Sequence, residues 1–187
     1  MHLAFFWLTR KTSLFAELYF GFSDKTVTSY FKYFCELVAD LLAVQDFRIG
    51  GDGIEVQIDE SKFGCRKYHR GHLVEELWIF GGVEKTQKRK VFLMPVTDKC
   101  EETLLAYIEW HIEPGSIIIF DMWRGYLNIE EKFSMQHFTV NHSVEFVNSK
   151  TGKNTNTIEE IWSGVKRKIT VRKRTESEIN LHLLEFV

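Results

Sequence analysis

Apolar side chains recur at intervals of three and four residues between Ser13 and Leu42, as they do on a helix with one buried face. The recurrence is interrupted at Gly21-Phe22-Ser23-Asp24, so this stretch predicts two helices rather than one. Gly21 suits the left-handed residue that ends the first helix, and Ser23 can accept hydrogen bonds from the amides that open the second. Residues 1–49 are therefore predicted to be a small helical segment.

Two helices joined by a tight turn have the layout of a helix-turn-helix, whose second helix presents its N-terminal side chains to DNA bases. In this sequence those side chains are Lys25, Thr26 and Thr28, which are candidate DNA contacts. An ordinary helical hairpin has the same layout, so both interpretations of this segment stay open.

Beyond Gly50-Gly51-Asp52-Gly53 the pattern changes to short apolar runs rich in β-branched and aromatic residues, which are typical of strands. Three longer stretches between and after these runs return to helical spacing. The order βββαβαβ-α predicts a mixed α/β domain over residues 50–187, whose first three strands form an antiparallel meander. The expected strands are residues 54–58, 77–83, 91–96, 116–120 and 136–140, and the expected helices are residues 100–112, 127–133 and 155–169.

The composition supports one core and a small appendage, because 44% of the 187 residues are hydrophobic. No apolar run approaches the roughly 20 residues of a membrane helix, and the opening run from Leu3 to Leu8 is short for a secretion signal. Cys35, Cys65 and Cys100 are odd in number and widely spaced, with no CxxC pair, which fits a reducing compartment. We therefore expect an intracellular protein without a membrane segment.

Charge is distributed unevenly along the chain, although the net charge is only -2. Residues 51–149 hold 11 basic and 16 acidic side chains, whereas residues 150–187 hold 8 basic and 5 acidic ones. An acidic middle and a basic end fit a chain that gathers carboxylates around a metal and holds a polyanion nearby. Simple unevenness gives the same counts.

Two aspartates directly follow apolar strands of the predicted sheet. Asp59 follows the run 54–58, and Asp121 follows the run 116–120. If these two strands are neighbours, their ends bring the carboxylates together, and paired carboxylates repel unless a divalent cation lies between them. The pair therefore predicts a Mg²⁺ or Mn²⁺ site, while either aspartate alone would favour a cap on the following turn or helix.

The last predicted helix carries a candidate third ligand. At about 100° per residue, Ile158, Trp162 and their apolar partners form one stripe, and Glu159 lies at its margin with Asn156 and Lys166 nearby. A carboxylate at the edge of a docked helix can complete a metal site, and a lysine there can meet a phosphate. An amphipathic helix with an incidental glutamate at its border is the alternative.

Basic and metal-binding residue types also occur elsewhere. His142 follows a predicted strand and is a candidate for contacting phosphate, with a structural role as the alternative. Cys65, His69 and His72 form only a partial set of zinc ligands, so no zinc is expected in this chain. A basic tract suited to the DNA backbone, or to an ordinary solvated surface, comprises Lys166, Arg167, Lys168, Arg172, Lys173 and Arg174.

Short motifs from about residue 50 to the end of the chain resemble, in order and spacing, the insertion-sequence transposases of the ISXO type and their eukaryotic relatives, the Merlin elements. The motifs are Asp59-Glu60-Ser61, Lys67-Tyr68-His69-Arg70-Gly71, Phe80-Gly81-Gly82, Asp121 with Trp123 and Tyr126, Val140-Asn141-His142-Ser143, Thr155-Asn156-Thr157-Ile158-Glu159, Trp162-Ser163 with Lys166-Arg167, and Leu184-Glu185-Phe186.

The resemblance implies an RNase H-like fold and a DDE-type site for DNA transposition and recombination, with two Mg²⁺ or Mn²⁺ ions. It implies Asp59, Asp121 and a third residue in the Asn156/Glu159 region as catalytic residues, of which we favour Glu159, with Lys166 as the accompanying lysine. It also implies DNA as partner, both transposon ends and target, a homodimer when active, and a place in the nucleus if the host is eukaryotic.

Full-length relatives usually carry an N-terminal zinc ribbon before the helix-turn-helix, and this sequence begins near the helices. A truncated copy, an incomplete gene and a domesticated descendant of a transposable element are all consistent with that difference. Two other activities remain open beside DNA transposition: a catalytically inactive DNA-binding protein that keeps the transposase fold, and an RNase H-like nuclease.

Overall fold

The computed structural model describes residues 2–44, 47–63, 77–121, 132–133, 135–140 and 152–187. The chain divides into two compact units, Met1–Asp46 and Phe47–Val187. Each unit is described by itself.

The first unit consists of three helices, α1 (His2–Leu8), α2 (Ser13–Phe20) and α3 (Asp24–Val44). The predicted break between α2 and α3 is confirmed. Gly21 has the left-handed φ of 68° and its amide donates to the Glu17 carbonyl, while Ser23 Oγ accepts from the Thr26 amide at 3.3 Å. Helix α1 was not predicted from the sequence; it packs Phe6 against rings of α2.

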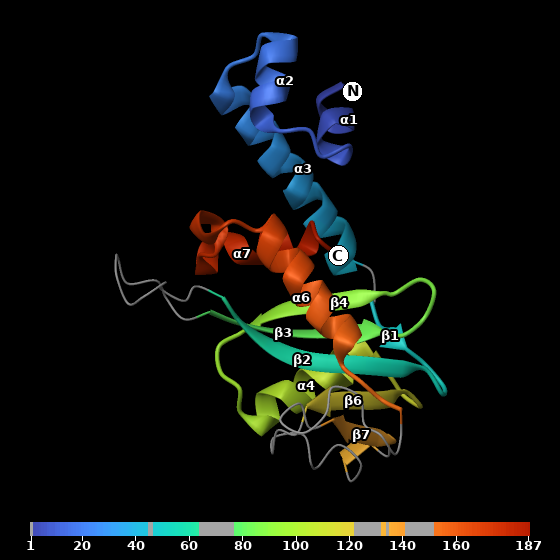
Figure 1. The fold of residues 1–187 in the computed structure, drawn as a ribbon. Helices are drawn as coiled ribbons and strands as arrows, with labels where there is room; N and C mark the ends of the chain where they lie inside the picture. Colours follow the sequence, from blue (N-terminus) through green and yellow to red (C-terminus); the bar gives the residue numbers. More distant parts are fainter. Residues whose placement is uncertain (1, 45–46, 64–76, 122–131, 134, 141–151) are drawn as a thin grey trace. The chain divides into compact units, whose positions relative to one another are not determined.

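The second unit is built on a five-stranded mixed sheet (Figure 1). The strand order is β4-β3-β2-β6-β7, in which β2, β3 and β4 form the predicted antiparallel meander and β6 and β7 continue the sheet in parallel with β2. The expected mixed α/β class is thus confirmed. The strands are β2 (Glu55–Phe63), β3 (Leu77–Glu84), β4 (Val91–Val96), β6 (Ile117–Asp121) and β7 (His137–Val140).

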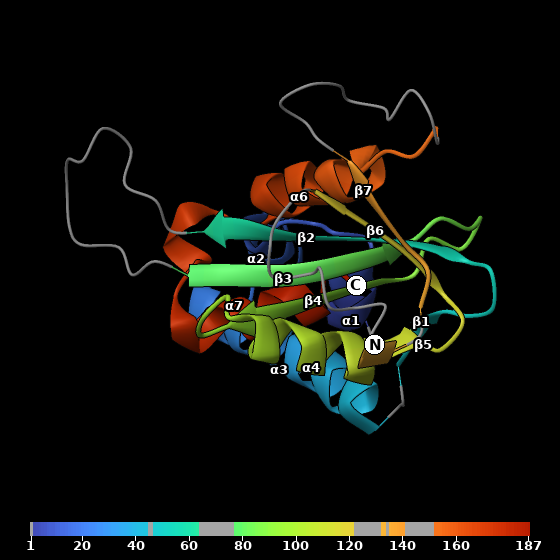
Figure 2. The same ribbon diagram turned by 90° about the horizontal axis from the view of Figure 1, so that it is seen from below.

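Helices cover both faces of this sheet, as Figure 1 and the view from below in Figure 2 show. Helix α4 packs on one face through an apolar cluster that includes Val56, Ile58 and Ile108. Helices α6 and α7 pack on the other face through a second cluster that includes Phe63 and Trp162. Their bounds are α4 (Glu101–His111), α6 (Asn156–Lys168) and α7 (Glu176–Leu184).

Some short elements escaped the sequence analysis. Strands β1 (Ile49–Gly50) and β5 (Ile112–Glu113) form a parallel pair of two residues each, too short to carry a period. The turn η3 (Val171–Lys173) and helix α7 were also not predicted. Most of the helix expected at residues 127–133 lies outside the described residues. None of the described helices has both the length and the apolar character needed to cross a bilayer.

The prediction that Asp59 stands at the end of a strand is wrong. Strand β2 continues to Phe63, so Asp59 lies within it. The run Asp59-Glu60-Ser61-Lys62 is polar, but β3 pairs with it residue by residue as far as Phe63↔Leu77 and thereby satisfies the backbone. Tertiary pairing here outweighs the local loss of apolar character.

Candidate active site

Strands β2 and β6 bring the two predicted aspartates onto neighbouring positions. These strands pair in parallel with the register Gln57↔Ile119, and the same register continued by two residues places Asp59 beside Asp121. Because side chains alternate between the faces of a sheet, both aspartates project from the face that carries Gln57. Asp59 is half-buried, whereas Asp121 ends β6 and is exposed.

Helix α6 is fixed over this part of β2 by Gln57, whose side chain is fully buried. The Ile158 amide, in the first turn of α6, donates to Gln57 Oε1 at 3.0 Å, and Gln57 Nε2 donates to the Asn154 carbonyl at 2.8 Å. A helix N-terminus has amides without intrahelical partners, and here the sheet supplies an acceptor for one of them. The register of α6 along β2 is therefore set by specific hydrogen bonds as well as by apolar packing.

A second polar contact ties α6 to β2 one turn further along the helix. The indole Nε1 of Trp162 donates to Asp59 Oδ2 at 2.9 Å. The Trp162 side chain is only 5% exposed and packs edge-on against Phe63. The sequence marked Trp162 as part of the apolar stripe and of a family-like motif but predicted no contact with a carboxylate, so this contact is a finding of the structure.

Glu159 lies between these two contacts on α6 and is exposed at the margin of the buried stripe, as predicted. Burial raises the pKa of Asp59 above its ordinary value, and the charges of Asp121 and Glu159 raise it further, against the hydrogen bonds from Trp162 and the Glu60 backbone. Glu159 is thus close enough to Asp59 for the two carboxylates to repel each other.

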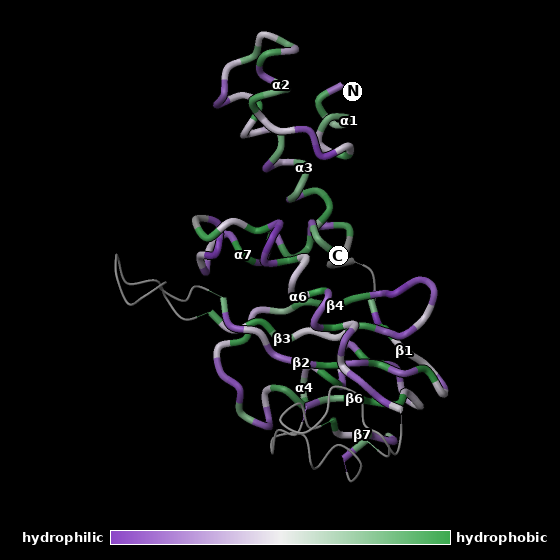
Figure 3. Tube along the Cα trace, in the orientation of Figure 1, coloured by the Kyte–Doolittle hydropathy of each residue, from purple (hydrophilic) through white to green (hydrophobic). Residues whose placement is uncertain are grey.

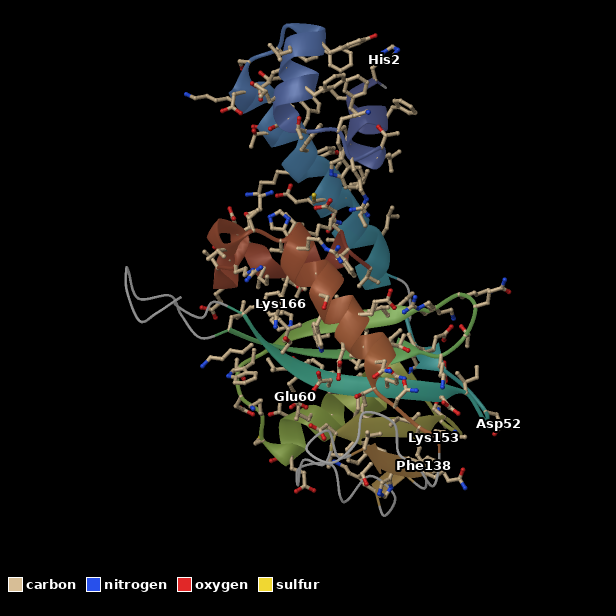
Figure 4. All side chains as sticks on the ribbon, in the orientation of Figure 1. His2, Asp52, Glu60, Phe138, Lys153 and Lys166 are labelled. Atoms are coloured by element: carbon tan, nitrogen blue, oxygen red, sulfur yellow. The ribbon has the colours of Figure 1, made fainter. Side chains whose placement is uncertain are left out.

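The other two polar residues predicted on α6 are also exposed. Asn156 is the first residue of the helix, and its backbone amide donates to Asn154 Oδ1 at 3.3 Å. On a helical wheel Asn156 is about 120° from Trp162, twice the separation between Glu159 and Trp162. Lys166 extends over the Phe63 ring, with Nζ 5.3 Å from the ring centre. Lys166 and Glu60 are labelled in Figure 4 and lie on opposite sides of β2.

Glu60 is a half-buried acidic residue beside the site, and the sequence did not single it out for chemistry. Burial raises its pKa to about 7, and Asp59 and Asp121 act in the same direction, while Lys99 opposes them. Its Oε1 is buried without a hydrogen-bond partner among the described residues. Alternation along β2 places Glu60 on the α4 face, opposite to Asp59.

The basic tract at the end of α6 does not form a uniform surface. Lys168 donates to the Glu185 carbonyl at 3.0 Å and pairs with the carboxylate of the same residue at 3.3 Å. Arg174 donates to the carbonyls of Lys166 and Ile169 and so satisfies the C-terminal end of α6. Arg167 and Lys173 are exposed, and the side chain of Arg172 lies outside the described part of the chain.

Two of the three candidate DNA contacts in the first unit also stabilise the start of α3. Thr26 Oγ1 lies 2.9 Å from Ser23 Oγ, and Thr28 Oγ1 donates to Asp24 Oδ1 at 3.1 Å. Lys25 is exposed. These contacts are those of a capped helix and are compatible with either interpretation of the segment.

Several predicted residues lie outside the described part of the chain. They are His142, the discounted zinc ligands Cys65, His69 and His72, and the family-like residues 67–71, 123, 126 and 141–143. Among the residues that are described, no three His, Cys, Asp or Glu side chains are gathered closely enough to hold a metal ion.

The donor set nevertheless suits a hard divalent cation. Asp59, Asp121 and Glu159 offer only carboxylate oxygens, which Mg²⁺ and Mn²⁺ prefer over nitrogen or sulfur. The charges of Asp121 and Glu159 raise the pKa of Asp59, and a bound cation would offset this repulsion. These three residues are the candidates to hold such an ion, although among the described residues they are not gathered around a common metal position.

The sequence did not reveal the roles of Gln57 and Trp162, the two side chains whose hydrogen bonds hold α6 on β2. Each binds a partner about a hundred residues away along the chain, so no local pattern could reveal the contact. One signal was available, because a glutamine inside the apolar run Ile54 to Ile58 needs buried hydrogen-bond partners.

The fold and the family match together indicate the class of protein. A mixed sheet of this strand order, with α6 on the face that carries Asp59 and Asp121, is compatible with an RNase H-like transposase fold. Residues 50–179, more than half of the chain, match the family of the ISXO2-like transposase domain, and the chain belongs to this family. The resemblance noted in the sequence is thereby confirmed. No curated protein gives a significant match to the chain.

Membership of the ISXO2-like transposase family indicates the general activity of the protein. The family consists of DDE-type transposases, which act on DNA and use divalent metal ions.

Proposed function

We propose that this chain is a DDE-type transposase, or a derivative of one, that cleaves and joins DNA phosphodiester bonds with Asp59, Asp121 and Glu159 as its metal ligands. The observation that supports the proposal most strongly is the strand register that sets Asp121 beside Asp59 on the face that α6 covers; the charges of Asp121 and Glu159 add to burial in raising the pKa of Asp59. Strand register and the docking of α6 produce this arrangement from three separate parts of the sequence.

The chemistry required is an in-line displacement at phosphorus. Divalent ions, when bound, supply charge neutralisation at the phosphate and activation of the attacking water or 3′-hydroxyl. The protein's own contribution is to hold three carboxylates on rigid elements, two strands and a helix that is anchored to one of them. We expect Lys166, which is exposed on the same helix, to contact a phosphate of the bound DNA.

The DNA backbone is the expected partner of the exposed basic side chains. Arg167 and Lys173 are exposed near the end of α6, and Lys25 is exposed on α3. We expect them to bind phosphates with little sequence preference, so that their contribution decreases as salt rises. Because transposition joins two ends, we propose a homodimer for the active form, acting inside the cell where the DNA is.

DNA cleavage tests the proposal. Purified protein and supercoiled plasmid are incubated with millimolar Mn²⁺, and nicked and linear products are followed on a gel. We expect the wild type to cleave, and Asp59→Asn and Glu159→Gln to lose cleavage while they still retard DNA in a gel shift. Glu160→Gln is the matched control, because Glu160 neighbours Glu159 and is also exposed, but pairs with Arg89 instead of facing Asp59.

The same assay separates the alternatives. A wild type that binds DNA but never cleaves it with any divalent ion would support the inactive DNA-binding protein. Cleavage of RNA in preference to DNA would support the RNase H-like nuclease. Loss of activity in Asn156→Ala together with full activity in Glu159→Gln would transfer the third position from Glu159 to Asn156.

A further inference from the structure

The indole of Trp162 packs against Gly81 and Phe63 on the α6 face of the sheet, a position that we call the indole seat. Gly81 of β3 pairs directly with Asp59 of β2, and a Cβ on Gly81 would lie 2.8 Å from the Trp162 ring at Cη2. The ring therefore lies against bare backbone, where only glycine leaves enough room. Phe63 closes the seat with its ring centre 6.2 Å from that of Trp162.

The indole seat fixes the direction of the only polar group of the Trp162 side chain, the indole N–H. Tryptophan has a single donor, Nε1, and the donor is directed at Asp59 Oδ2 at 2.9 Å. The contact also joins two elements, because Trp162 belongs to α6 and Asp59 to β2. The orientation of the carboxylate is therefore coupled to the docking of the helix that carries Glu159.

We propose that Trp162 is the positioning residue of the Asp59 carboxylate, whose orientation its indole N–H holds ready to bind a divalent cation. The inference rests on the proposed function, since it concerns the same three carboxylates. Side chains that hydrogen-bond to metal ligands fix the orientation of those ligands, and their loss typically weakens metal binding by about 10- to 100-fold.

Packing alone does not account for the arrangement. A phenylalanine would fill most of the volume of the seat, and the α6 face already holds Ile158 and Val165, both fully buried without any polar atom in the side chain. The hydrogen bond instead brings a buried donor to a half-buried carboxylate that is already repelled by two others. A contact with a charged acceptor is stronger than one between neutral groups, so the indole limits the rotation of the carboxylate.

Metal binding by a variant without the donor tests the inference. Trp162→Phe keeps an aromatic ring and removes the N–H. We expect calorimetry with Mn²⁺ to give a dissociation constant about 10- to 100-fold weaker than that of the wild type. The matched control is Val165→Ala, which removes packing from the same apolar cluster but leaves the indole in place. It should unfold at a lower temperature and bind Mn²⁺ as the wild type does.

Three outcomes overturn the inference, and they are distinguishable. Equal Mn²⁺ affinity in the wild type and Trp162→Phe contradicts the positioning role and leaves the proposed function intact. An equal loss of affinity in Trp162→Phe and Val165→Ala reduces the role to packing. A wild type that binds no Mn²⁺, even with duplex DNA present, overturns the proposed function and this inference with it.

A measurement on the wild type keeps the inference testable if Trp162→Phe does not fold. In protein labelled with ¹⁵N-tryptophan, the Nε1–H resonance of Trp162 is identified as the one that Asp59→Asn displaces most. Titration with Mg²⁺ should shift this resonance along a curve with the calorimetric dissociation constant. A Trp162 resonance that does not move while Mg²⁺ binds would contradict the positioning role.

Discussion

The two faces of strand β2 are built differently. On the α4 face, Val56 and Ile58 are fully buried in a cluster of apolar side chains. On the α6 face, Gln57 and Asp59 interrupt the apolar packing with hydrogen bonds to α6. The α4 face is thus held by apolar packing, whereas the α6 face adds directional hydrogen bonds that fix the position of α6 on the sheet. Both faces contribute to the core, but only the α6 face combines its apolar cluster with the polar residues of the candidate site.

Figure 3 shows a related contrast along the chain. Strand β4 is largely hydrophobic, whereas β2 mixes hydrophobic and hydrophilic residues and the turn between β3 and β4 is hydrophilic. Residues 85–90 of this turn hold four basic side chains, of which Lys85 pairs with Glu55 and Arg89 with Glu160. Exposed pairs of this kind contribute little to stability, which is why Glu160→Gln serves as a control for Glu159→Gln.

Truncation on the α4 face should produce the largest loss of stability. Ile58→Ala removes a fully buried side chain from the apolar cluster and should lower the free energy of unfolding by about 2–5 kcal/mol. Urea denaturation measures the change. Val171→Ala, at a residue that is 58% exposed, is the control and should stay within about 0.5 kcal/mol. Equal effects of the two substitutions would contradict the assignment of the α4 face to the core.

The carboxyl of Glu60 should make the metal-free protein less stable as pH rises. Its pKa is raised from 4.5 to about 7 by burial, so between these values the folded state binds more protons than the unfolded state. Stability is therefore highest below about pH 4.5, as far as this group is concerned, and decreases through pH 7 by no more than about 3 kcal/mol. The raised pKa of Asp59 acts with the same sign.

Unfolding midpoints of wild type and Glu60→Gln across this pH range check the prediction. Glu60→Gln should flatten the dependence, and its advantage over the wild type should increase with pH. A wild type whose stability rises between pH 5 and about 7 by the same amount as that of Glu60→Gln would contradict the role of this carboxyl.

Removal of the polar contacts of Gln57 should cost less than the truncation of Ile58. Gln57→Met keeps the volume but leaves the Ile158 amide and the Asn154 carbonyl without their partner, a loss of about 1–3 kcal/mol. Chemical denaturation measures it. Asn154→Ala is the comparison variant: it keeps the backbone carbonyl that accepts from Gln57 and removes only the longer contacts of Asn154 Oδ1, so it should have a smaller effect. If Gln57→Met were as stable as the wild type, the hydrogen bonds to α6 would contribute nothing to its docking.

The sequence predicts the elements of the second unit well because their periods are local. Strands β3 and β4 coincide with the apolar runs to within one residue, and α6 with its amphipathic stripe. The end of β2 was misplaced because Asp59-Glu60-Ser61-Lys62 is polar and its strand character comes from pairing with β3. Helix α7 was missed because only Ile179 and Leu183 mark its buried face.

The sequence alone indicated the candidate carboxylates of the site. It did not indicate the hydrogen bonds that hold the elements carrying them. Asp59 and Asp121 follow from the strand pattern, and Glu159 from its place beside the stripe of α6. The hydrogen bonds of Gln57 and Trp162 connect distant parts of the chain, and so do the contacts that occupy Lys168 and Arg174. Tertiary structure decides which members of a polar group support the fold and which stay exposed.

Mn²⁺ binding at the α6 face tests the central claim most directly. Calorimetric titrations, with duplex DNA present, compare the wild type with Asp59→Asn, Asp121→Asn and Glu159→Gln, and with Glu160→Gln as control. We predict binding by the wild type and the control, and a loss of more than about 100-fold in each of the other three, beyond what removal of a supporting residue causes. Mn²⁺ affinity unchanged in all three ligand variants would contradict a carboxylate metal site at this edge of the sheet.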